Sequence, residues 1–234
     1  MIAIMKRDLR GFFTSPIGYV FLAVFLLVCN YFFFSYNVSG GASSLSYVFS
    51  NMLLVLVFLI PLITMRLMSE EMRQRTDQML LTAPVRIADI VLGKYLSAML
   101  VFVIALACTF TWPLIVTMFG DPAIYEIFGN YVAMLLLISC LVSIGLFISS
   151  LTESQIIAAI LSFVVMLSLF MFSSIASAVD NVVVSAVLNW LSVFSRYSSF
   201  TAGVFSLADI VYYISVTVVF LFLTARIIEK KRWA

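Results

Sequence analysis

No charged residue occurs between residues 11 and 65, and this run of 55 residues is the strongest constraint that the sequence places on the fold. A helix needs about 20 consecutive apolar residues to cross a bilayer core of about 30 Å. The run therefore predicts two membrane-spanning helices, divided by the polar turn "NVSGGASS" at residues 37–44. It is also much longer than the apolar region of a cleaved secretory signal, about 7–15 residues, so we expect the N-terminus to be retained.

The rest of the chain continues this pattern. Of its 234 residues 64% are hydrophobic and the mean hydropathy is +1.19, whereas soluble domains are about 45–50% apolar. We therefore predict an all-α integral membrane protein, with residues 1–234 forming a single membrane domain. Six spans are expected, at about residues 17–36, 47–67, 95–118, 131–151, 155–177 and 208–227.

The distribution of lysine and arginine orients these spans. Six crossings bring both termini to the same side of the membrane. Of the 13 lysines and arginines, 12 lie in the termini or the 2–3 connection, and only Arg196 lies on the opposite side. Because cytoplasmic loops carry the excess of basic residues, we expect both termini and the 2–3 connection to be cytoplasmic.

The residues before the first span predict a short helix in the membrane interface. Its apolar side chains share one arc, and three cations share the next arc, where anionic headgroups would lie. Alternatively, the cations only set the topology. Ser15 and Pro16 then provide a capping residue and a first-turn proline for the first span. The apolar arc contains Ile2, Met5, Leu9, Phe12 and Phe13, and the cations are Lys6, Arg7 and Arg10.

The segment between the last two spans, about residues 178–207, is too apolar for an ordinary aqueous loop. We expect short re-entrant or interfacial helices that pack against protein, because backbone groups in a membrane must be satisfied internally. A plain surface loop is the alternative. Arg196 should have a partner at this depth, and Asp180 and Asp209 are the two candidates.

Several chemistries are excluded by residues that the sequence lacks. It contains no histidine, which removes imidazole as a base or metal ligand, and no metal site is expected. Gly93 and Lys94 lack the rest of a P-loop, so the chain should not bind ATP through that motif. The three cysteines lie in apolar stretches and are expected to pack as small apolar side chains.

Charge is concentrated in residues 66–94, which hold nine of the chain's 24 charged residues. Glu71 and Arg75, and Arg73 and Asp77, are spaced i,i+4, which predicts a helix over residues 69–81. Residues 82–84 should end it, and a second helix should begin at Pro84. A helix with both charge signs and an apolar edge suits docking to a partner. The alternative is a solvated loop that only orients the protein.

Glu70, Glu71 and Arg75 also fit the EExxxR pattern of CAAX-type intramembrane proteases, and Phe222 and Arg226 fit their FxxxR element. Those enzymes require a histidine that this chain lacks, so the protease is the weaker alternative. A membrane scaffold without transport activity is the other one.

The segment "SEEMRQRTDQMLLTAPVRIADIVLGKYL" resembles the hallmark segment of type-2 ABC exporter permeases. Arg75 stands where that pattern usually has glycine, and Gln78 where it usually has an acid. Residues 6–21 and 194–213 resemble the gliding-motility and copper-processing permeases of that class. The matching positions are Glu70, Glu71, Thr76, Leu80, Leu81, Pro84, Val85, Ile90, Val91, Gly93 and Lys94.

This resemblance implies a permease subunit in a bacterial cytoplasmic membrane, paired with a second permease of the same or a different kind. Two separate ATPase subunits would bind the ATP and Mg²⁺, leaving this chain with no cofactor, and a membrane-anchored accessory subunit is often encoded nearby. Membrane lipid is a further expected partner, and nucleic acid is not. The segment between spans 2 and 3 would couple to the ATPase through Glu70, Glu71, Arg73, Arg75, Thr76, Leu80, Leu81 and Pro84.

Overall fold

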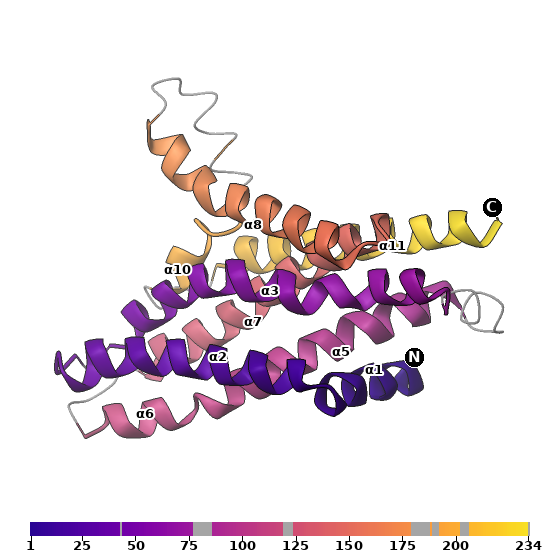
Figure 1. Cartoon of the computed structure of the whole chain (residues 1–234). Helices are drawn as coiled ribbons and strands as arrows, with labels where there is room; N and C mark the ends of the chain where they lie inside the picture. Colours follow the sequence, from indigo (N-terminus) through magenta and orange to yellow (C-terminus); the bar gives the residue numbers. More distant parts are fainter. Residues whose placement is uncertain are drawn as a thin grey trace.

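The computed structural model of the chain is a bundle of long helices (Figure 1). It describes residues 1–42, 44–76, 86–118, 124–178, 188, 192–201 and 206–233. Within these ranges every regular element is a helix, which confirms the predicted fold class.

Six helical segments are long and apolar enough to cross a membrane, as predicted. Most extend beyond the predicted spans because the polar residues at the membrane edges remain helical. The fourth helix, for example, begins at Ile124 rather than near residue 131. The main helices of these segments are α2 (Pro16–Phe33), α3 (Ser46–Gln74), α5 (Ile87–Cys108), α7 (Ile124–Leu151), α8 (Gln155–Ala178) and α11 (Leu207–Trp233).

Two of the spans are irregular near one end. The first finishes in a π-helical turn, η1 (Phe34–Val38), and the third is broken between α5 and α6 (Thr111–Val116). At that break the Thr109 carbonyl accepts a hydrogen bond of 2.9 Å from the hydroxyl of Tyr131. The carbonyl that the break frees from the helical pattern is thereby satisfied inside the bundle, as a break at membrane depth requires.

The centre of the bundle is the pair α3 and α7, whose backbones approach closely. A Cβ atom at Gly145 would lie 2.8 Å from Cβ of Thr64, so only glycine fits there. One turn further along, the Ser69 hydroxyl donates to the Ser149 carbonyl at 3.0 Å. Small side chains and short hydroxyl contacts of this kind are typical of helix pairs in membranes.

The predicted N-terminal helix is present as α1 (Ile2–Thr14), and Pro16 begins α2 as expected. Ser15 occupies the capping position, but its hydroxyl donates back to the Phe12 carbonyl at 3.3 Å and caps no N–H of α2. The side-chain cap predicted for Ser15 is therefore wrong, although the chain does turn at this residue.

Both termini lie at the same end of the bundle as the end of α3 and the start of α5 (Figure 1). Arg7 forms an ion pair with Glu71 of α3, and Lys231 of α11 donates to the Ser150 carbonyl of α7 at 2.9 Å. We call this end the inner end. Its cytoplasmic location remains a prediction from the charge distribution.

Candidate functional site

A buried lysine stands at the centre of the inner end. Lys94 lies two turns into α5, and its side chain is 2% exposed. Its ammonium group lies 2.8 Å from a carboxylate oxygen of Glu71 and 3.3 Å from one of Asp8. It also donates to the Leu67 carbonyl at 2.7 Å. The three ammonium hydrogens thus have three acceptors, on α1 and α3.

Arg7 completes the group on the solvent side. It lies 2.9 Å from Asp8 and forms a second ion pair with Glu71. Partial burial lowers the pKa of the Arg7 guanidinium, but the two carboxylates outweigh burial and the pKa is raised. Arg7, Asp8, Glu71 and Lys94, which we call the inner ion cluster, hold two positive and two negative charges that neutralise one another.

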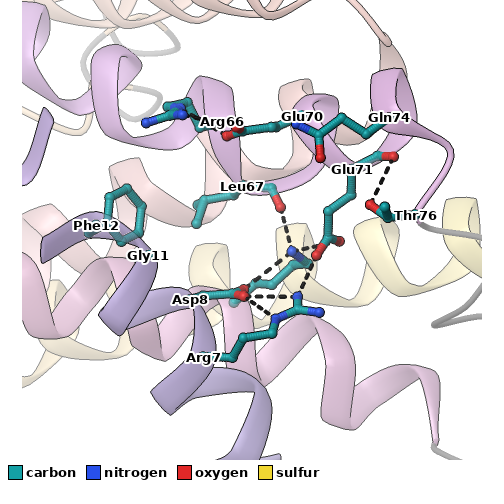
Figure 2. Close-up of a pocket in the computed structure, with 11 residues that line it drawn as sticks. Arg7, Asp8, Gly11, Phe12, Arg66, Leu67, Glu70, Glu71, Gln74 and Thr76 are labelled. Carbon is teal, nitrogen blue, oxygen red and sulfur yellow. Dashed lines mark hydrogen bonds and ion pairs between the residues drawn. The ribbon is translucent and has the colours of Figure 1, made fainter. Parts of the chain in front are cut away.

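The inner ion cluster forms one wall of a cavity of about 400 Å³ between α1 and the end of α3. Figure 2 shows Arg7 and Asp8 pointing from α1 toward Glu71 of α3, with the Leu67 carbonyl above them. On another wall Arg66 and Glu70 form an ion pair of 2.8 Å within α3. The cavity is lined by Arg7, Asp8, Gly11, Phe12, Arg66, Leu67, Glu70, Glu71, Gln74, Thr76 and Lys94.

The residues predicted to form an interfacial helix lie in different environments, some buried against protein and others exposed. Phe12 is buried in the protein core and Phe13 is half-buried, whereas Lys6 and Arg10 are exposed. Arg7 belongs to the inner ion cluster, so its guanidinium is committed to protein carboxylates. The amphipathic pattern is real, but part of its apolar side packs on protein. Contact of Lys6 and Arg10 with headgroups remains a prediction.

The predicted coupling helix is interrupted. Helix α3 runs without a break from Ser46 to Gln74, and Arg75 adopts the left-handed conformation with φ +56°. Hydrogen bonds from the Thr76 amide to the Glu71 carbonyl and from the Arg75 amide to the Met72 carbonyl close the helix end, in the pattern of a Schellman motif. A continuous helix over residues 69–81 is therefore wrong.

This helix end explains why glycine is usual at the position that Arg75 occupies in this chain. A left-handed residue other than glycine costs roughly 1–2 kcal/mol, and the hallmark pattern usually has glycine here. Because Arg75 lies beyond the helix, the expected i,i+4 pair with Glu71 does not form, and Glu71 binds Arg7 and Lys94 instead. Leu80, Leu81, Pro84 and the Arg73–Asp77 pair involve residues 77–85, which lie outside the described residues.

At the opposite end of the bundle, Arg196 pairs with Asp209, one of the two partners predicted for it from the sequence. Its guanidinium lies 2.9 Å from a carboxylate oxygen of Asp209 and 4.1 Å from the centre of the Tyr212 ring. Asp180, the other candidate partner, lies outside the described residues. The following short helix α10 (Tyr197–Thr201) packs on α7, where the Tyr197 hydroxyl donates to Asn130 at 3.1 Å.

Sequence reasoning missed the roles of Asp8 and Lys94. The sequence places Lys94 in the connection before the third span, although the helix begins seven residues earlier and carries it inside the bundle. The signal that was available is its apolar surroundings, because an ionisable residue in an apolar helix predicts a charged partner. Its partner Asp8 is 86 residues away, and sequence spacing could not identify it.

A family model described as "ABC-2 family transporter protein" matches residues 2–233. The chain belongs to the ABC-2 transporter family. Membership identifies it as a membrane component of an ABC transporter rather than an enzyme, and implies association with an ABC ATPase and dimerisation in general. No curated protein matches the chain, and its place among the gliding-motility and copper-processing permeases remains a prediction.

The family assignment also decides between the alternatives left open by the sequence. The EExxxR pattern of this ABC-2 transporter chain has a structural explanation, because Glu70 pairs with Arg66, Glu71 belongs to the inner ion cluster and Arg75 ends α3. The protease interpretation is therefore replaced by that of a transporter subunit.

Proposed function

We propose that the chain is the permease subunit of an exporter and that its inner end receives movement from a separate ATPase subunit. The observation that carries the proposal is the position of Glu71. It lies at the last turn of α3, next to the segment that resembles a coupling element, and its carboxylate binds cations of both α1 and α5. A push on the end of α3 is therefore transmitted to two other elements.

The surface available to the ATPase begins where the buried part of α3 ends. The last residues of α3 and the turn after it are exposed, and two of the four are arginines: Arg73, Gln74, Arg75 and Thr76. Lys6 and Arg10 expose further positive charge on α1. An ATPase surface with acidic side chains beside an apolar groove would complement this face.

The remaining parts of the proposal follow from the resemblance. Two ATPase subunits would bind ATP and Mg²⁺ and serve two permease subunits in a bacterial cytoplasmic membrane, with a membrane-anchored accessory protein as an additional partner. ATP binding would close the ATPase pair, and the inner ends of the spans would follow. This is an equilibrium between two states, so the docking surface must make different contacts in each state.

The test uses the chain purified with its ATPase and reconstituted in lipid nanodiscs. We expect the wild-type chain to retain a soluble protein with a Walker A motif and to stimulate its ATP hydrolysis. Arg73→Glu with Arg75→Glu should abolish this stimulation by reversing the docking charge while leaving the inner ion cluster intact.

Glu70→Lys with Glu71→Lys should also abolish stimulation, because the reversal disturbs both the surface and the cluster. Insertion of the variants into the membrane is the control. The proposal fails if no such ATPase accompanies the wild-type chain, as expected of a scaffold, or if both double variants still stimulate hydrolysis like the wild type.

A further inference from the structure

We infer that Asp8 and Lys94 are positioning residues that lock α1 onto the inner ends of α3 and α5, so that these three elements move as one block during transport. The inference rests on the proposed function, which supplies the ATPase that drives the movement. It adds to the proposed ATPase-docking surface a specific contact between helices, which we call the joint and which is made by Asp8 and Lys94.

The burial of Lys94 is the first step of the argument. Taking an ammonium group out of water is unfavourable unless carboxylates and hydrogen-bond acceptors surround it. Lys94 meets this condition only while α1 and α3 both stay beside α5, because Asp8 comes from α1 and Glu71 with the Leu67 carbonyl from α3. Separation of α1 would remove one carboxylate from the buried ammonium group, and separation of α3 would remove the other carboxylate and the carbonyl.

A close steric contact lies directly beside this ion pair. A Cβ atom at Gly93 would be 3.1 Å from Cβ of Ile4 and 3.1 Å from the Met1 carbonyl oxygen. The absent side chain therefore lets the first turn of α1 approach α5, and α1 packs more extensively on α5 than on α2. Neighbouring residues of α5 thus hold α1 in two independent ways, by shape at Gly93 and by charge at Lys94.

The cavity beside the cluster does not require a ligand. Among the described residues, each charged side chain that lines it already has an ionic partner: the four members of the inner ion cluster pair with one another, and Arg66 pairs with Glu70. A cavity whose charges are mutually satisfied is better explained as the space around a joint than as a binding pocket.

The experiment uses the complex of the full chain with its ATPase in lipid nanodiscs. In Lys94→Met and in Asp8→Asn the ATPase should remain bound, because the docking surface is unchanged. We expect the stimulation of ATP hydrolysis to fall about tenfold, since loss of one partner from a buried ion pair strongly weakens the joint. Arg226→Met removes a cation from an exposed ion pair within α11 and should leave stimulation unchanged.

A second measurement separates positioning from stability. A spin label at Ala3, an exposed and uncharged residue of α1 that is not part of the proposed docking charge, should keep the same mobility with and without ATP in the wild type. In Lys94→Met the label should become more mobile when ATP is added, because α1 no longer follows α3 and α5. A purely structural role would change the free energy of unfolding without an ATP-dependent change at this label.

A steric variant tests the same joint with every charge retained. Gly93→Leu should push α1 off α5 and reduce stimulation, whereas Gly11→Leu, at a position with open space, should not. If Lys94→Met does not insert, Asp8→Asn and Gly93→Leu decide the matter. Stimulation within about twofold of wild type in these variants would overturn the inference. Absence of stimulation in the wild type would instead overturn the proposed function.

Discussion

Helices α7 and α8 follow one another in the chain and are equally apolar, yet they occupy opposite environments. Each has a mean hydropathy of 2.6 over its most apolar part, but 72% of that part is buried in α7 and 18% in α8. In Figure 1 α7 lies among the other helices, whereas the later turns of α8 rise away from them. Hydropathy predicts that both helices enter the membrane, but not which of them forms the core.

The side chains at the contacts account for the difference. Helix α7 presents Gly145 and Ser149 to α3, and Asn130 to α10. Among the described side chains of α8, four are buried: Ala158, Ser162 and Met166, which form a narrow stripe at every fourth residue, and Ala176 near its end. Since lipid tails are as apolar as leucine, helices associate in membranes through close packing and hydrogen bonds rather than through hydropathy. The two helices thus show this principle within one chain.

The largest expected effect comes from the same substitution in each helix. Leu141→Ala in α7 removes a fully buried side chain and should lower the free energy of unfolding by about 3 kcal/mol, through lost contacts and a cavity. Leu161→Ala in α8 alters a residue that is 45% exposed and should cost less than about 0.5 kcal/mol. Denaturant titration of the monomeric chain in micelles measures both, and equal losses would contradict the comparison.

A somewhat smaller effect is expected at the closest approach of α3 and α7. Gly145→Val should lower the free energy of unfolding by about 2 kcal/mol, because the new side chain overlaps Thr64. Adding Thr64→Gly should recover part of the loss by making room on the other helix. If the second substitution only adds to the first, the two residues are not coupled and the close approach does not control packing.

The smallest expected effect on stability comes from replacing one serine in each of the two helices by alanine. Ser149→Ala removes the hydroxyl that accepts from the amides of Met68 and Ser69 at 3.2 Å, and should cost about 0.6 kcal/mol, the average for hydrogen bonds between membrane helices. Ser168→Ala removes a hydroxyl that bonds only within α8 in the described structure and should be neutral. The same denaturant titration measures both variants. A larger loss of stability in Ser168→Ala than in Ser149→Ala would contradict the comparison, because it would show that the packing of α8 depends on this hydroxyl.

Much of this architecture was predictable because membrane crossing depends on local properties. Runs of apolar residues predicted six spans, and Pro16 predicted the turn after α1. The end of α3 was not predicted, because the i,i+4 charge spacing favoured a helix through residue 81, whereas Arg75 adopts the left-handed conformation and the helix ends at Gln74.

The inner ion cluster and the exposure of α8 could not be predicted in the same way. The contact between Asp8 and Lys94 depends on how α1 packs on α5, and no local pattern encodes a pairing across 86 residues. Likewise, the sequence of α8 has the same hydropathy as a core helix. What distinguishes it is whether its small residues meet small residues on another helix, and this is a property of the packed pair.

The most direct test of the account is where the ATPase contacts the chain. After Cys29, Cys108 and Cys140 are replaced by alanine, a photo-reactive cross-linker is attached to a new cysteine in Thr76→Cys or Ser198→Cys, at exposed positions on opposite ends of the bundle. The account predicts a cross-link to the ATPase from residue 76 and none from residue 198. A cross-link from residue 198, or none from residue 76 while the ATPase remains bound, would contradict coupling at the inner end.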